Sequence, residues 1–87
     1  MDLMDYREQI DRIDEELLLL FQKRMEISWQ IACYKKEHNL PVMDAAREKE
    51  KLGDISEKAG EGFDLYAQKL YKTLFEISRE YQERAML

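Results

Sequence analysis

The chain has 87 residues and a mass of 10.5 kDa, which suits a single small domain. Hydrophobic residues make up 45% of it and charged residues 38%, a composition that excludes intrinsic disorder. The net charge of −5 opposes non-specific binding to nucleic acids or anionic membranes, so we expect neither as a partner. With only three glycines and one proline, the sequence favours an all-α fold over a β-sandwich or a barrel.

The first half of the chain predicts one long helix, because no glycine or proline occurs between Asp5 and about His38. At 1.5 Å per residue this helix is roughly 50 Å long, more than a globule of this mass needs. A seam of residues recurs along it in alternating four- and three-residue steps, namely Tyr6, Ile10, Ile13, Leu17, Leu20, Arg24, Ile27, Ile31 and Tyr34. A second apolar stripe contains Leu18, Met25, Trp29 and Cys33. Two further helices would not cover both faces, so we expect the chain to form a homodimer.

Two shorter helices are predicted after the long one. Pro41 ends the first helix, and Asp44 is the expected N-cap of a short helix that runs to about Lys58. The next turn is marked by Gly60 and Gly62, and a third helix of medium length is predicted from about Asp64 to Arg84. The three helices form one expected domain over residues 1–87.

We expect a cytoplasmic location. Cys33 is the single cysteine and cannot form an internal disulfide bond. Asp2 and Asp5 stand where a signal peptide would have basic residues followed by an apolar run. The longest purely apolar run, Leu17 to Phe21, is far shorter than the roughly 20 residues that span a bilayer.

Arg24 stands at a seam position where an apolar residue is expected, so its guanidinium needs an anionic partner. A polar residue that fixes helix register, or an internal salt bridge, would explain it equally well. Lys35 favours a ligand site, because eleven residues are close to three turns and place the two cations on one face, roughly 16 Å apart. Ile27, Ser28 and Ile31 lie between them.

Polar residues also occur on the packing faces of the other two helices. Asp44, Arg47 and Glu48 follow the i, i+3, i+4 spacing of one helix face, although a capping Asp with a solvated ion pair is the simpler explanation for this group alone. Ser78 and Gln82 lie four residues apart within an apolar stripe, where hydrogen bonds to backbone or water would also satisfy them.

Taken together, these residues predict a helix-lined cavity for a small dicarboxylate that carries a hydroxyl or an ether oxygen. The sequence offers no activated nucleophile, since Cys33 is expected to be a packed thiol and His38 to complement the dipole at the end of the long helix. Neither metal-ligand spacing nor a glycine-rich phosphate loop occurs, so we expect no metal and no cofactor.

Short motifs follow one another in order along the chain. They are Arg7 in Tyr-Arg-Glu-Gln-Ile-Asp-Arg-Ile-Asp, Arg24 in Lys-Arg-Met-Glu-Ile, Lys35 in Tyr-Lys-Lys, the segment Pro41-Val42-Met43-Asp44-Ala45-Ala46-Arg47-Glu48, and the tail Ser78-Arg79-Glu80-Tyr81-Gln82. This ordered combination resembles the all-helical, bacterial-type chorismate mutases over essentially the whole chain. The resemblance implies an intertwined dimer of three-helix chains that rearranges chorismate to prephenate, a step towards phenylalanine and tyrosine.

The resemblance also implies roles for individual residues. Arg24, together with an Arg7 from the other chain, would bind substrate carboxylates, and Lys35 would serve a carboxylate and the ether oxygen. Arg47 and Ser78 would complete the anion-binding surface, while Glu48 and the Asp44 region would place the ring hydroxyl. Gln82 would donate to the ether oxygen. The implied catalytic residues are therefore Lys35, Gln82, Arg24 and Glu48, and they act by electrostatic stabilisation and by restricting the substrate's conformation.

Two other functions fit the same scaffold. One is a lyase that removes pyruvate from isochorismate, but a carboxylate at Glu48 suits the ring hydroxyl of chorismate, and the short connection from Glu37 to Met43 is typical of the mutase. The other is a non-catalytic helical module that dimerises, or that regulates by binding a metabolite or a partner enzyme. Such a module would not need both Lys35 and Gln82 directed at one oxygen.

Overall fold

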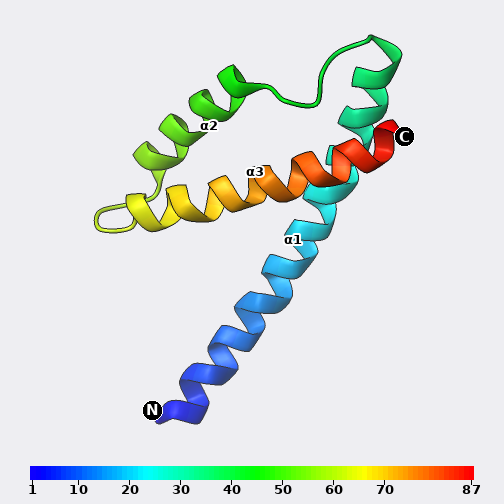
Figure 1. Cartoon of the computed structure of the whole chain (residues 1–87). Helices are drawn as coiled ribbons and strands as arrows, with labels where there is room; N and C mark the ends of the chain where they lie inside the picture. Colours follow the sequence, from blue (N-terminus) through cyan, green and yellow to red (C-terminus); the bar gives the residue numbers. More distant parts are fainter.

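The computed structural model describes residues 1–87 as three helices and no strand (Figure 1). α1 spans Leu3–Glu37, α2 spans Ala45–Lys58 and α3 spans Asp64–Met86. The predicted all-α class, with one long, one short and one medium helix, is confirmed. None of the three helices has the apolar length that a membrane crossing requires.

Local hydrogen bonds explain where the helices begin and end. Asp2 and Asp5 form a capping box at the start of α1, in which each carboxylate accepts the other residue's backbone N–H at 3.0 Å. Asp44 caps α2, as predicted, by accepting a first-turn backbone N–H at 3.0 Å. Gly60 and Gly62 have φ angles of +88° and +83°, which glycine adopts without strain in the turn before α3.

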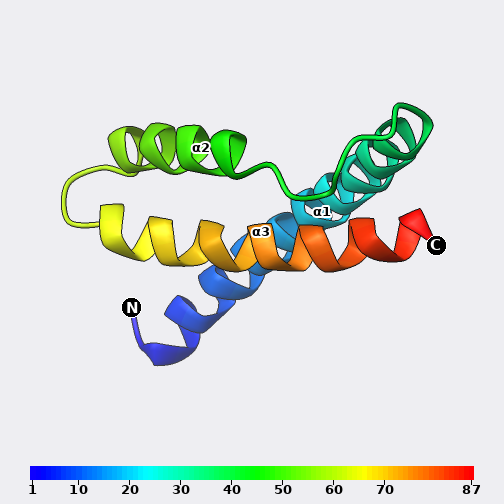
Figure 2. The ribbon, with the colours of Figure 1, turned by 45° about the horizontal axis from the view of Figure 1, so that its top comes forward.

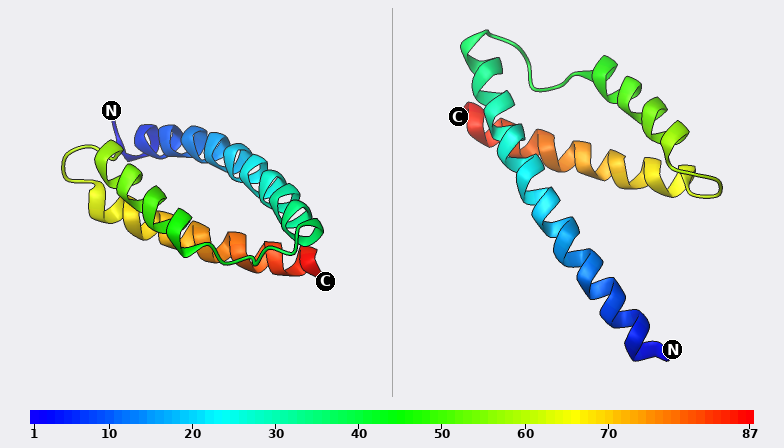
Figure 3. Two further views of the ribbon diagram at one scale, coloured as in Figure 1. Left: turned by 90° about the horizontal axis from the view of Figure 1, so that it is seen from above. Right: turned by 180° about the vertical axis from the view of Figure 1, so that it is seen from behind.

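α3 is the helix that packs against both others. It crosses the C-terminal half of α1 and runs back alongside α2, whereas no Cα atom of α1 lies within 8 Å of one in α2 (Figures 1 and 2). At the crossing, the rings of Trp29 on α1 and Tyr81 on α3 contact each other with centroids 5.1 Å apart. The N-terminal half of α1 projects away from the other two helices (Figure 3).

The chain buries little apolar surface on itself. Only five of the 87 residues are buried, and three of these are the polar residues Ser28, Ser78 and Gln82. The radius of gyration is 16.0 Å, against about 12 Å for a compact chain of this length. The accessible surface is 7330 Å², against roughly 5,400 Å² for a compact monomer of this mass.

The excess surface includes the predicted apolar seam of α1. Tyr6, Ile10, Ile13, Leu17 and Leu20 each keep more than half of their surface exposed, because neither α2 nor α3 reaches this part of the helix. The chain alone therefore leaves the seam without a packing partner.

Cys33 is a correction to the sequence analysis, because its thiol is exposed rather than packed. α3 covers the adjacent face of α1, where Ser28 and Ala32 are buried, and leaves the side of Cys33 open.

Candidate active site

A cavity of about 680 Å³ lies between the C-terminal half of α1, the start of α2 and the C-terminal half of α3. Its lining combines many cations with few anions. The cationic side chains are Lys23, Arg24, Lys35, Arg47, Lys51 and Arg79, and the carboxylates are Asp44 and Glu48. Since the whole chain carries a net charge of −5, this positive excess is a local feature that suits an anionic ligand.

Most residues that the sequence analysis assigned to substrate line this one cavity. They are Arg24, Lys35, Asp44, Arg47, Glu48, Ser78 and Gln82. Arg7 is the exception, since it is exposed near the N-terminus of α1, on the half that projects away from the other helices (Figure 3). The cavity of a single chain thus lacks the arginine that the resemblance assigns to the partner chain.

Two side-chain hydrogen bonds join α1 to α3 beside the cavity. Arg24 Nη1 donates to Ser78 Oγ, and Gln82 Nε2 donates to Ser28 Oγ at 2.9 Å. The polar residues predicted on the packing face of α3 therefore find partners on α1. Each bond leaves donors to spare, because a guanidinium carries five N–H groups and an amide two.

The anionic partner expected for Arg24 is not present in the chain. None of the four ion pairs involves this residue, and its hydrogen-bond acceptor is the neutral hydroxyl of Ser78. The side chain is only half-buried and faces the cavity, so water can solvate its charge. This correction excludes an internal salt bridge within the chain and leaves the charge available to a ligand.

Lys35 lies in the last turn of α1 and contacts the connection that follows it. Its Nζ donates to the backbone carbonyl of Val42 at 2.8 Å. An ammonium group has three donors, so two of them are free for other acceptors. The contact fixes the long side chain at one side of the cavity.

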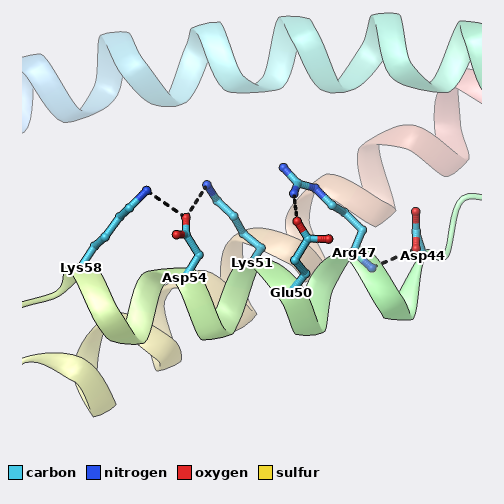
Figure 4. Close-up of polar contacts among 6 residues, drawn as sticks. All are labelled: Asp44, Arg47, Glu50, Lys51, Asp54 and Lys58. Atoms are coloured by element: carbon cyan, nitrogen blue, oxygen red, sulfur yellow. Dashed lines mark hydrogen bonds and ion pairs between the residues drawn. The ribbon is translucent and has the colours of Figure 1, made fainter.

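Arg47 forms a solvated ion pair next to the capping Asp44, which is the simpler of the two explanations given for this group, but its partner is neither Asp44 nor Glu48. Its guanidinium pairs with Glu50 at 3.3 Å, while Asp44 is engaged as the N-cap (Figure 4). The pair is solvated, with side chains 61% and 73% exposed, and contributes at most about 1 kcal/mol. Arg47 is therefore held only weakly in the free chain.

Glu48 instead pairs with Arg79, which the sequence analysis did not single out. Arg79 Nη1 lies 2.5 Å and 2.6 Å from the two carboxylate oxygens and links α3 to α2. The hydrogen bonds to Glu48 raise the pKa of Arg79, against an opposing effect of burial and with help from the charge of Glu48. A signal was present in the sequence, because Arg79 adjoins Ser78 and lies three residues before Gln82.

The lining therefore offers cations, an amide and two carboxylates to one open cavity. His38 lies outside the cavity, where its Nδ1 is 2.8 Å from the carbonyl of Tyr34 at the end of α1. No group of three or more His, Cys, Asp or Glu side chains is placed to hold a metal ion. Such a lining is suited to binding and polarising an organic dianion.

The fold and this cavity define a small all-helical domain with a cationic site between its three helices. The model of the chorismate mutase type II family matches residues 6–83, so the chain belongs to that family. The resemblance found in the sequence motifs is thereby confirmed.

The curated relatives are longer proteins. The chain is 41% identical to a T-protein of Haemophilus influenzae, over 72% of this chain and 18% of that protein. It is 31% identical to a bifunctional chorismate mutase/prephenate dehydratase of Buchnera aphidicola subsp. Schizaphis graminum, over 98% of this chain and 23% of that protein. A protein of the same name from Aquifex aeolicus is 41% identical over 56% of this chain and 14% of its own length. The chain thus spans less than a quarter of each of these relatives. No solved structure is significantly similar to it.

Proposed function

We propose that this chain is an isomerase that rearranges chorismate to prephenate in the biosynthesis of phenylalanine and tyrosine. The observation that carries the proposal is the convergence of Arg24, Lys35, Glu48 and Gln82 on one cavity. Chorismate is a dicarboxylate with a ring hydroxyl and an ether oxygen, and these side chains are complementary to those groups. Membership of the chorismate mutase type II family supports the same substrate.

The proposed mechanism is electrostatic and conformational. The rearrangement breaks a carbon–oxygen bond and forms a carbon–carbon bond within one molecule, so it requires no nucleophile, proton transfer or cofactor. Arg24 and Lys35 bind the carboxylates and hold the flexible substrate in its compact reactive conformer. Lys35 and Gln82 donate to the ether oxygen, where negative charge accumulates as the bond breaks.

The remaining residues of the cavity are proposed to bind and orient the substrate. Arg47 and Ser78 complete the anion-binding surface, and the weak solvated pair between Arg47 and Glu50 can open when a stronger anion arrives. Glu48 accepts a hydrogen bond from the ring hydroxyl, and the Asp44 region bounds the same end of the cavity.

We further propose that the active form is an intertwined homodimer with two shared sites. The accessible surface exceeds that of a compact monomer by about 1,900 Å² per chain, an area in the range of obligate homodimer interfaces. The exposed seam of α1 supplies the apolar surface for this contact. Arg7 of one chain would complete the cavity of its partner.

The proposed location is the cytoplasm. Cys33 is a free and exposed thiol, which fits a compartment where thiols stay reduced.

The test is direct incubation of the purified chain with chorismate, following the loss of its absorbance and identifying the product. Formation of prephenate is the expected result. Release of pyruvate would favour the lyase, and recovery of unchanged chorismate would favour the non-catalytic module. Arg24→Ala serves as the control that separates turnover by this site from a contaminating enzyme.

A further inference from the structure

The ion pair between Glu48 and Arg79 has a geometry that bears on substrate choice. A single nitrogen, Arg79 Nη1, donates to both oxygens of Glu48, at 2.5 Å and 2.6 Å. This arrangement fixes the direction of the carboxylate as well as its position. A carboxylate has about four lone-pair directions, so acceptor capacity remains for a further donor from the cavity.

We propose that Arg79 is a positioning residue, which orients Glu48 to accept the hydrogen bond of the substrate's ring hydroxyl and so selects hydroxylated substrates. This inference rests on the proposed function, and specifically on the role proposed there for Glu48. It assigns to Arg79 an effect through Glu48 rather than a contact with the substrate.

The charges of the cavity explain why Glu48 needs such a partner. A dianionic substrate is repelled by a free carboxylate, and Glu48 is one of two carboxylates in the lining. Arg79 is the one ion-pair partner of Glu48, because Arg47 pairs with Glu50 and Lys51 with Asp54. The side chains of Arg79 and Glu48 are 28% and 22% exposed, so solvent screens their attraction less than that of the pairs along α2.

A purely structural role is the competing explanation. The two hydrogen bonds of this pair are the only side-chain hydrogen bonds that join α2 to α3, so the pair could simply hold the two helices together. The two explanations differ in what they predict for a substrate without the hydroxyl. A structural defect affects both substrates alike, whereas a misdirected Glu48 affects only the hydroxylated one.

The experiment compares chorismate with an analogue whose ring hydroxyl is replaced by hydrogen. For Arg79→Gln we expect kcat/KM with chorismate to fall about 10- to 30-fold, as for a hydrogen bond to a charged group, mainly through a higher KM. With the deoxy analogue the same variant should change kcat/KM by about threefold or less. Arg79→Lys should recover part of the loss, since it restores the charge without the guanidinium geometry.

Two further variants complete the comparison. Lys58→Gln is the matched control, because it also removes one cation from an ion pair of α2, with Asp54 at 3.2 Å, yet lies outside the cavity. It should leave kcat/KM unchanged with both substrates. The charge-swapped variant E48R/R79E keeps an ion pair between the helices, so its melting temperature should approach that of the wild type while discrimination between the substrates stays lost. Recovery of discrimination in the swapped variant would overturn the proposal.

Other outcomes separate the inference from the function on which it rests. The positioning role would be overturned if Arg79→Gln lost kcat/KM equally with both substrates. It would also be overturned if Glu48→Gln lost kcat/KM and Arg79→Gln did not. Either result would leave the mutase proposal intact. Calorimetric titration with prephenate and its deoxy counterpart gives a readout that is independent of turnover. If Arg79→Gln weakens prephenate about 10-fold and spares the deoxy compound, the positioning role stands even where turnover fails. Equal affinities of the wild type for both compounds would overturn it.

Discussion

Arg24 combines a seam position with the lack of an anionic partner, which distinguishes it from a structural arginine. Its one side-chain hydrogen bond in the chain is donated to Ser78 Oγ, and its side chain is half-buried at the cavity. An arginine with a purely structural role at such a position would be expected to have a carboxylate nearby. The guanidinium of Arg24 lies at the cavity, where a bound dianion would supply the missing negative charge.

We therefore predict that Arg24→Ala abolishes most turnover without unfolding the protein. The loss of one preorganised donor should cost about 3 to 4 kcal/mol in the transition state, which steady-state kinetics would measure as a fall in kcat/KM of roughly 10²- to 10³-fold. Helix content by circular dichroism should stay the same, and the melting temperature should fall by a few degrees at most, because the half-buried, solvated guanidinium contributes only its hydrogen bond to Ser78. A variant that loses its helices, and whose folded remainder turns over normally, would contradict the site assignment.

Gln82 gives a prediction about pH. An amide donates at all working pH values, whereas Gln82→Glu can donate to the ether oxygen only when its carboxyl is protonated. The activity of the variant should therefore rise as the pH falls, relative to the wild type in the same buffers. The Ser28 hydroxyl can donate to a carboxylate as well as accept from the amide, so the contact at residue 82 is expected to persist. A pH profile parallel to that of the wild type between about pH 5 and 8 would show that residue 82 does not contact the reacting oxygen.

At the scale of whole helices, the sequence predicted the elements well and their side-chain pairings poorly. The capping residue Asp44, Asn39 with its φ of 55° after α1, and the two glycines of the second turn act locally, so they set helix ends that can be recognised without tertiary structure. α1 ends at Glu37, before Pro41 is reached. The end of α3 has no such signal and lies two residues beyond the predicted one, at Met86. At the site, helical periodicity likewise placed Ser78 and Gln82 correctly on the packing face of α3.

The pairing of Glu48 with Arg79 could not be predicted in that way. It joins residues 31 positions apart, and it depends on how α2 and α3 are rotated against each other, which helical periodicity does not specify. The group Asp44, Arg47 and Glu48 posed a different problem, which lay within one helix. The capping Asp and the solvated ion pair were expected, but the spacing did not identify Glu50 as the partner of Arg47, because an i, i+3 neighbour was equally available on the helix surface.

Gly53 is a local weak point of α2 that can be tested by a single substitution. A Cβ atom added there would meet nothing within 4 Å, and the residue lies inside a helix. Gly53→Ala should therefore stabilise the protein by roughly 0.5 to 1 kcal/mol, seen as a melting temperature a few degrees higher at equal protein concentration. Gly62→Ala is the matched control and should lower the melting temperature, because its φ of +83° strains any residue with a Cβ. An unchanged or lower value for Gly53→Ala would show that this face of α2 is covered in the folded protein.

At the scale of the molecule, the elongated shape bears on the proposed dimer. The chain measures 54 × 25 × 14 Å, and its longest dimension is close to the length of α1. The exposed N-terminal part of the seam, from Tyr6 to Leu20, and the cavity lie on different halves of this helix. A two-fold dimer would bury the first and complete the second in one step, because each chain meets the same surface of its partner.

The proposed sharing of each site between two chains can be tested by a complementation experiment. Arg7 and Arg24 lie seventeen residues apart on α1, hence roughly 25 Å along it, so one small substrate cannot contact both in one chain. If two α1 helices cross in antiparallel fashion near Leu17 to Leu20, Arg7 of one chain lies opposite a point between Arg24 and Lys35 of the other.

Arg7→Ala and Arg24→Ala should each be nearly inactive alone. Unfolding and refolding them together should give mixed dimers with one intact site and one doubly damaged site. With random pairing about half of the dimers are mixed, so roughly a quarter of wild-type activity should return. Mass spectrometry would verify that subunits have exchanged. Each variant refolded alone is the control. If dimers have exchanged subunits but show no activity, the sites are not shared.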